Sequence, residues 1–597
     1  MTHTAPQPER KAADTAALLQ DIAQRSQQLL SDYFQRAGKD DGYSVLDPQA
    51  MLNAFQELGS RYLAQPQKLL QTQMAFWLDS VELWKREMEK LWLQKPVAPL
   101  SEPVAGDKRF KDEMWAQNFV FDYLKQAYLL ASNHLLDSVN KVEGIDAHSA
   151  KKTAFYLRQY IDAMSPTNFI ATNPQVLKAT LESGGENLLK GLREMLDDLQ
   201  RSKGRLAFKM TDLNAFRLGE NIATTPGKVV YENELMQLIQ YAPSTDKVFE
   251  RPLLVIPPWI NKFYILDLKA KNSLIKWAVD QGHTVFVISW VNPDEKLRDK
   301  RFDDYMLEGP LAALDAIQQA TGAKDVKALA YCIGGTLLAS TLAYMASKRD
   351  NRIKAATFMT TLMDFSDIGE LEVFVDEQQM EQLEAHMHKK GYLEGHHMAD
   401  VFNLLRENDL VWSFVVNNYL LGKEPMAFDL LYWNSDSTRM PAAMHSFYLR
   451  NMYLYNRLRE PGGIELDGVP IDLRQIKTPA YWISTREDHI APWRTTYLGT
   501  QLLSGPKRFV LGGSGHIAGI VNPPSANKYG YCTNDALPET ADEWLQGSTP
   551  HEGSWWSDWA QWVADYNGKQ VAARQPGDGK LQPIEDAPGR YVKARLV

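Results

Sequence analysis

The stretch that decides the fold is KALAYCIGGTLLAS, residues 327–340, in which a buried strand gives way to a helix. Cys332 stands at the junction, where a sharp strand-to-helix turn lifts a nucleophile out of the edge of a sheet. Unpaired N–H groups at the start of the helix favour a thiolate and an oxyanion, so the backbone N–H of Ile333 is the expected first oxyanion donor. Ala330, two positions before the cysteine, departs from the glycine that is usual there.

A catalytic cysteine needs a base to take its proton and an acid to orient that base. In this type of fold the order along the chain is nucleophile, acid, histidine, with the last two after late strands. The strand PAYWIST (479–485) leads to Asp488, and the strand KRFVLGG (507–513) leads to His516. The order predicts a triad of Cys332, Asp488 and His516. The alternative is an inert buried cysteine, a helix-capping aspartate and a packed loop histidine.

Six short apolar runs after about residue 205 alternate with helical patterns. They span residues 252–258, 284–290, 326–331, 354–362, 479–485 and 507–513. This alternation predicts an α/β fold with a mostly parallel sheet and helices on both faces. The long helical and aromatic-rich interval before the fifth run predicts a lid insertion at 363–475, over the sheet edge where ligands bind. The alternative is that these residues are the ordinary core of an inserted subdomain.

The residues before this predicted sheet show helical patterns in place of alternating strands and helices. Residues 1–14 are polar and expected to be disordered, and residues 15–204 predict a helical N-terminal domain before a catalytic domain at 205–597. Within residues 69–94 an apolar seam follows four-three spacing along one helix face. Its members are Leu70, Met74, Trp77, Val81, Trp84, Met88 and Leu91. The seam either packs on helices of its own domain or serves dimerisation, a partner protein or a hydrophobic particle.

Composition excludes several classes of protein. A chain of 597 residues is too long for one ordinary core, and a net charge of −9 without a basic stripe argues against nucleic-acid binding. No run reaches the roughly 18 apolar residues of a transmembrane segment, and the N-terminus lacks the apolar region of a secretory signal. The only cysteines are Cys332 and Cys532, so we expect a reducing cytosol and a structural role for Cys532.

One histidine-rich segment contains possible metal ligands. The sequence HMHKKGYLEGHHMAD, residues 386–400, contains His386, His388, His396 and His397. Close histidines can bind a metal, but neither a cysteine nor a clear carboxylate geometry accompanies them in the sequence. We therefore expect a solvated lid loop and no metal site.

Several motifs together resemble one family, the class I polyhydroxyalkanoate synthases of the α/β-hydrolase superfamily. They are YCIGGT, TREDHIAPW, SGHIAGIVNPP, PPWINKFYILDL, FDLLYWNSDST and APGRYVKARL. By this resemblance Cys332 carries the acyl chain, His516 acts as base and Asp488 is its acidic partner. His489 matches a position near the family's site, and Arg406 is a candidate contact for coenzyme A.

The resemblance implies a 3-hydroxyacyl-coenzyme A substrate, with 3-hydroxybutyryl-coenzyme A the expected one and no separate cofactor. A thiolate that attacks a thioester exchanges one thioester for another, and the acyl-cysteine can then acylate the 3-hydroxyl of a monomer or growing chain. Asp488 either activates that hydroxyl or only orients His516. The family also implies a cytoplasmic enzyme at the surface of polyester granules, a homodimer, and phasin-like partners.

Two other functions remain open at this level. An esterase, thioesterase or intracellular depolymerase would use the same fold, although such enzymes commonly carry serine as nucleophile. A granule-coating protein without catalysis would not need a nucleophile, an acid and a base in this order.

Overall fold

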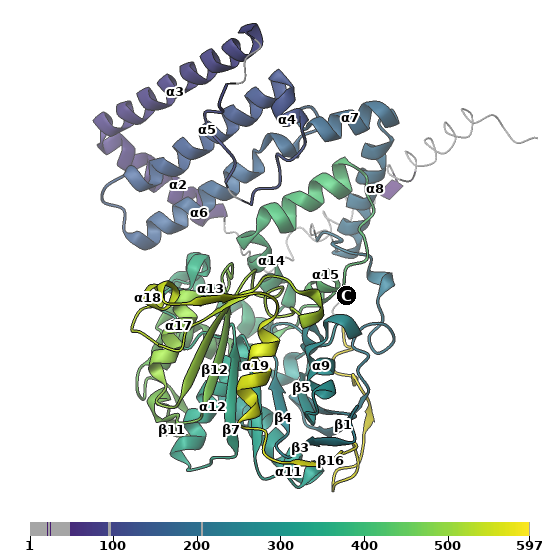
Figure 1. Cartoon of the computed structure of the whole chain (residues 1–597). Coiled ribbons are helices and arrows are strands. Elements are labelled where there is room, and N and C mark those ends of the chain that lie inside the picture. The colour runs from purple at the N-terminus through teal and green to yellow at the C-terminus, as the bar shows by residue number, and fades with distance from the viewer. Residues whose placement is uncertain are drawn as a thin grey trace, which may run out of the picture. The chain divides into compact units, whose positions relative to one another are not determined.

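A computed structural model describes residues 21, 24–25, 48–93, 97–104, 106–203 and 207–595 (Figure 1). The segment 1–14 that is expected to be disordered lies outside these residues. The contacts divide the chain into two compact units. One unit holds the chain up to Met210 together with Val401–Met426, and the other holds Thr211–Asp400 and Ala427–Leu596. Residues 363–475, the predicted insertion, are therefore shared between the two units.

The first unit confirms the prediction of a helical N-terminal region. Its helices are α2 (Pro48–Ala64), α3 (Pro66–Leu93), α4 (Met114–Gln117), α5 (Phe119–Lys141), α6 (Ala147–Ala163), α7 (Pro174–Ser183) and α8 (Glu186–Arg201). Polar side chains cap three of them, since Asn118, Asp146 and Asn173 each accept hydrogen bonds from N–H groups in the first turn of α5, α6 and α7. Such caps satisfy N–H groups that have no partner within the helix.

Helix α3 presents its apolar seam to solvent. Six of the seven seam residues are exposed, namely Leu70, Met74, Trp77, Val81, Trp84 and Leu91. The face that packs on α5 is instead mixed: Leu83 and Glu87 are buried, Asp79 contacts His134 at 2.8 Å, and Lys90 pairs with Asp122. The interpretation in which the seam packs on its own domain's helices is therefore wrong for these six residues.

The second unit is built on an eleven-stranded sheet in the order β15-β14-β13-β12-β7-β6-β4-β5-β2-β1-β17. In chain order its strands are β1 (Gly227–Glu232), β2 (Met236–Tyr241), β4 (Leu253–Ile256), β5 (Val285–Trp290), β6 (Val326–Tyr331), β7 (Ile353–Met359), β12 (Ala480–Thr485), β13 (Lys507–Gly512), β14 (Tyr531–Thr533), β15 (Thr549–His551) and β17 (Glu585–Asp586). Three small ladders pair β3 (Lys247–Phe249) with β16 (Gln570–Ala572), β8 (Tyr392–Leu393) with β9 (Met440–Pro441), and β10 (Glu465–Leu466) with β11 (Val469–Pro470).

The six predicted strands are the six central strands, β13 to β5, and the five pairings among them are all parallel. The prediction of a mostly parallel sheet is thus confirmed. The five outer strands pair antiparallel and were missed. Three of them have only two or three residues, too few for an apolar pattern to stand out from a loop.

The remaining helices belong mainly to this unit. They are α9 (Leu274–Asp280), α10 (Phe302–Met306), α11 (Ala312–Thr321), α12 (Ile333–Ser347), α13 (Glu377–Lys390), α14 (Gly395–Leu405), α15 (Asp429–Asn434), α16 (Ala442–Tyr448), α17 (Trp493–Leu502), α18 (Ala541–Gln546) and α19 (Trp555–Ala564). In the described part of the chain no helix has the length and apolar character needed to span a membrane.

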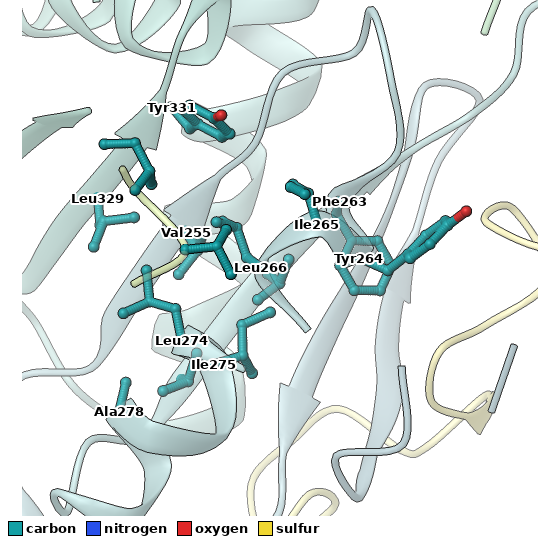
Figure 2. Close-up of a cluster of buried hydrophobic side chains, with 14 of the residues drawn as sticks. Val255, Phe263, Tyr264, Ile265, Leu266, Leu274, Ile275, Ala278, Leu329 and Tyr331 are labelled. Carbon is teal, nitrogen blue, oxygen red and sulfur yellow. The ribbon is translucent and has the colours of Figure 1, made fainter. Parts of the chain in front are cut away.

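One large core anchors β6, the strand that ends at the sharp strand-to-helix turn of Cys332, which we call the elbow. Leu274 and Ile275 of α9 lie beside Val255 of β4 and Leu329 of β6 (Figure 2). Trp559 of α19 joins the same core. Because successive side chains of a strand alternate between its faces, Leu329 and its neighbours fix β6 from both sides. The sheet therefore holds the end of β6 in one place.

Candidate active site

The elbow at the end of β6 has the geometry that its sequence predicts. Cys332 has φ 54° and ψ −125°, a left-handed conformation that is strained for any residue with a side chain. Two backbone hydrogen bonds hold this residue: the Cys332 N–H donates to the Met359 carbonyl at 2.9 Å, and the Cys332 carbonyl accepts from the Gly335 N–H at 2.8 Å. The strain is thus locked in by β7 on one side and α12 on the other.

The two glycines after Cys332 allow close approach between α12 and its neighbours. A Cβ atom on Gly334 would lie 2.3 Å from the carbonyl oxygen of Ile256, and one on Gly335 would lie 2.0 Å from the Thr361 hydroxyl. Neither glycine has a positive φ, so they are needed for packing rather than for backbone freedom. Ala330 is fully buried and stays in register with β4 and β7, so alanine fits at the position that usually holds glycine.

The structure brings the predicted acid and base together. His516 Nδ1 lies 2.7 Å from Asp488 Oδ2, and both side chains are buried. The other oxygen of Asp488 accepts hydrogen bonds from the backbone N–H groups of Ile490 and Ala491, at 2.9 and 2.8 Å. Both oxygens of this carboxylate are therefore engaged inside the protein, which fixes the His516 ring.

The charge of Cys332 acts on the same ring, so the sulfur, the imidazole and the carboxylate are electrostatically coupled. Burial lowers the pKa of His516, but the negative charges of Asp488 and Cys332 outweigh it and raise the pKa to about 10. The ring therefore holds its proton near neutral pH and faces the sulfur as an imidazolium.

Ile333, the predicted oxyanion donor, is the first residue of α12. The N–H groups of a first helical turn have no partner within the helix and carry the positive end of its dipole. Its N–H therefore has no partner within α12, and it stays the predicted donor to the negative charge that develops when a carbonyl is attacked.

Tyr331 supports the histidine and was not found by sequence analysis. Its hydroxyl donates to the His516 carbonyl at 2.8 Å, and its ring stacks on the imidazole with centroids 5.4 Å apart. The tyrosine is next to the nucleophile in the sequence, but only the fold brings the loop after β13 above it.

Two further tyrosines are influenced by the charge of Cys332. The rings of Tyr448 and Tyr453 pack edge to face, and burial followed by the charge of Cys332 raises the pKa of Tyr453. The segment that follows Tyr448, Leu449–Leu454, is a π-helical turn that contains Tyr453. Residues five apart in an α-helix point about 140° apart, whereas the wider π turn places them on one side. The turn thus aligns both rings, with centroids 5.4 Å apart.

The other predicted site residues have more ordinary settings. His489 follows Asp488 and is half-buried. Arg406 belongs to the helical unit, where it is exposed and pairs with Asp409. Cys532 lies on β14 and both cysteines are free thiols, so no disulfide blocks Cys332.

The histidine-rich segment differs from its prediction. His386 is buried on α13, and His397 is buried at the start of α14, so they do not lie in a solvated loop. A carboxylate also accompanies them, since Glu394 and His396 are 3.1 Å apart. Sequence analysis missed this grouping because the approach of Glu394 depends on the turn between β8 and α14.

Three of the quoted motifs meet in a buried network away from the sulfur. Lys262 pairs with Asp436 at 2.7 Å and donates to the carbonyls of Val592 and Ala594. The Tyr264 hydroxyl donates to the same aspartate at 2.9 Å. A buried ion pair with additional hydrogen bonds holds segments together, so these motifs fasten the C-terminal segment to the catalytic unit.

Comparisons with known proteins show which family the whole chain resembles. Residues 106–278 match the family model described as the N-terminus of poly-beta-hydroxybutyrate polymerase (PhaC), and residues 253–523 match the alpha/beta hydrolase fold. The chain is 49% identical to the poly(3-hydroxyalkanoate) polymerase of Methylorubrum extorquens, over 93% of this chain and 91% of that protein. It is 43% identical to the polymerase subunit PhaC of Cupriavidus necator, over 87% of this chain and 88% of that protein.

Solved structures give a more distant likeness. A hydrolase from Pseudomonas aeruginosa PA01 aligns with 13% identity and a TM-score of 0.29, covering 49% of this chain and 92% of that one.

Proposed function

Because the chain belongs to the poly(3-hydroxyalkanoate) polymerases, acyltransferases of the α/β-hydrolase superfamily, we propose that Cys332 carries the acyl chain and that (R)-3-hydroxyacyl-coenzyme A thioesters are the substrates. The observation that carries this proposal is the buried pair of His516 and Asp488, whose imidazole also responds to the charge of Cys332. 3-Hydroxybutyryl-coenzyme A is the substrate with which we would begin.

The first half of the reaction loads the enzyme. His516 already holds the proton, and the Cys332 thiolate attacks the thioester carbonyl while the oxyanion is stabilised by the Ile333 N–H. The carbon–sulfur bond to coenzyme A breaks, and its thiolate leaves with the proton from His516. One thioester replaces another, so the acyl group stays activated.

The second half lengthens the chain. The 3-hydroxyl of the next monomer loses its proton to His516 and attacks the acyl-cysteine, which forms an oxyester and frees the Cys332 thiolate. The longer chain is now a coenzyme A thioester that acylates Cys332 again. Asp488 orients the histidine rather than taking the hydroxyl proton, because both its oxygens already accept hydrogen bonds.

Tyr453 takes part by donating a hydrogen bond to the bound acyl group. The π turn holds Tyr453 beside Tyr448. Burial and the charge of Cys332 both raise the pKa of each hydroxyl, so both stay protonated. A phenol in this setting is a donor without a competing charge.

Water must be kept away from the acyl-cysteine, because hydrolysis would waste every activated monomer. Residues 363–475 form the proposed lid, in keeping with their position between β7 and β12. Mobile elements over such sites close when substrate binds.

The apolar seam of α3 is proposed to contact the surface of the polyester granule. Its exposed residues include Trp77 at 64% and Trp84 at 57% exposure, which is unusual for tryptophan in water. An apolar polymer needs no specific partner chemistry and would be covered by such a face. A phasin-like protein and a second copy of the chain are the competing occupants.

One experiment separates the possible functions. The purified full-length protein is incubated with 3-hydroxybutyryl-coenzyme A, and thiol release, polymer and free acid are measured. We expect coenzyme A with insoluble polymer. Coenzyme A with free 3-hydroxybutyrate would indicate a thioesterase, and no release would indicate a non-catalytic granule protein. Either result contradicts the proposal.

A further inference from the structure

A cluster of nitrogen and oxygen ligands lies outside the proposed catalytic machinery. Glu394, His396 and His397 each offer one ligand atom, and these atoms lie within 4.8 Å of one another. No other group of three such side chains with this spacing occurs in the part of the chain that the structure describes. The cluster combines two imidazoles with one carboxylate, the ligand types that zinc accepts.

The turn that carries the cluster is compact. Glu394 follows β8, and the N–H of His397 donates to the Glu394 carbonyl at 3.1 Å. A Cβ on the intervening Gly395 would lie 2.7 Å from the carbonyl oxygen of Thr438, so the turn is pressed against the chain before β9. The pairing of β8 with β9 holds the same region.

The distances are close to those of a metal site. His396 Nδ1 lies 3.1 Å from Glu394 Oε2, and the rings of His396 and His397 have centroids 4.0 Å apart. Two ligands bound tetrahedrally to one zinc ion at about 2.0–2.1 Å lie about 3.3 Å from each other. The remaining approach, about 1.5 Å or less for the third ligand, needs only rotation of an imidazole about its side-chain bonds.

We propose that Glu394, His396 and His397 bind a divalent transition metal ion, with zinc the best match to two imidazoles and a carboxylate. His386 packs edge-on against His397 with centroids 5.3 Å apart, so α13 can supply a further ligand. A bound ion would then link α13 to the start of α14 and stiffen this part of the proposed lid.

One charge nearby opposes the ion. Lys390 donates to Glu394 Oε1 at 2.9 Å, while Oε2 faces His396. The ammonium competes for the carboxylate and repels a cation, and the positive end of the α14 dipole adds to this effect. Removal of the lysine charge should therefore strengthen metal binding, an effect that a damaged fold would not produce.

The test measures Zn²⁺ binding by equilibrium dialysis of the full-length protein at neutral pH. Every sample carries Cys332→Ala, so that the active-site thiol does not bind the probe. We expect one ion per chain, at least a tenfold loss of affinity for the double variant His396→Ala/His397→Ala, and tighter binding for Lys390→Met. His388→Ala is the matched control, because His388 is an exposed histidine of the same segment and should change nothing.

Two results with the parent protein and the double variant would overturn the proposal. One is the absence of binding by the parent protein at Zn²⁺ concentrations up to roughly 100 μM, which is weaker than an ordinary protein site. The other is equal binding by the parent and the double variant, which would place the ion elsewhere. Thermal melting of each variant shows whether it is folded, and an unchanged affinity in Lys390→Met would also count against the site.

Discussion

Helices α12 and α3 differ in where their apolar residues lie. Every residue of α12 from Ile333 to Met345 is buried, because the helix packs between β6, β7, β4 and the chain that follows. Helix α3 buries Leu83 and Glu87 on a mixed face and leaves its tryptophans in solvent. The first arrangement positions a reactive group rigidly, whereas the second leaves an apolar surface for something outside the chain. Variants in the two regions test whether α12 positions the reactive group and whether α3 serves as a contact surface.

The largest effect is expected at the sulfur. Cys332→Ser should lower coenzyme A release from 3-hydroxybutyryl-coenzyme A by about a thousandfold or more, since a hydroxyl is a far weaker nucleophile and forms an unactivated oxyester. The melting temperature should change little, because the two side chains are similar in size. Near-normal polymer formation by the serine variant would refute the thioester-exchange mechanism.

Asp488→Asn should lower activity by about a hundredfold or more, because the histidine loses its orienting charge. Against the lowering effect of burial, Asp488 and Cys332 together raise the pKa of His516 to about 10, above its ordinary 6.5, and the part of this rise that comes from the carboxylate stabilises the folded state. That contribution is fully present below pH 6.5 and is lost as pH rises through about 10. Thermal melting should therefore show a stability gap between wild type and variant that is widest near pH 6 and shrinks toward pH 10. A gap that widens over this range would contradict the assignment.

A pair of glycine substitutions compares the two regions directly. Gly334→Ala should destabilise the protein by about 1–3 kcal/mol and reduce activity, because its Cβ would meet the Ile256 carbonyl at 2.3 Å. Gly59 occupies an exposed position of α2, where a Cβ would meet nothing within 4 Å. Gly59→Ala should therefore stabilise the helical unit by about 0.5–1 kcal/mol. Denaturant unfolding measures both. Equal effects would show that the tight packing at the elbow is not special.

Tyr453→Phe should reduce polymerisation by about tenfold, the value of one lost hydrogen bond near the reacting atoms. Tyr455→Phe is its control, since that ring is exposed and its hydroxyl bonds to Glu377 instead. Rates over a range of substrate concentrations distinguish kcat from KM. Identical rates for both variants would remove Tyr453 from the mechanism.

The smallest effect on rate is expected for variants of α3, which should change the binding of the protein to polymer particles and not its rate of reaction. Trp77→Ser/Trp84→Ser should leave coenzyme A release unchanged but weaken cosedimentation with polyhydroxybutyrate particles by roughly tenfold or more, because both side chains lose apolar contact. Leu181→Ser is the control, an exposed apolar residue of α7 with 74% exposure. If the double variant binds particles normally and instead changes the mass of the protein in solution, the seam is a contact between copies of the chain.

The sequence by itself determined the centre of the fold and the order of the chemical groups. Short apolar runs indicate buried strands locally, and an elbow, a late aspartate and a late histidine are properties of chain order. The six central strands and the separate positions of Cys332, Asp488 and His516 could therefore be predicted without coordinates.

Tertiary structure alone decided which surfaces and side chains meet. The outward seam of α3, the edge strands, the alignment of Tyr448 with Tyr453 and the approach of Glu394 to His396 all depend on pairing between separate segments or on a local turn. Spacing along a helix shows that apolar residues share a face, but it does not show which face the neighbouring helix covers. That choice follows from the sum of contacts over the whole domain, which no local pattern contains.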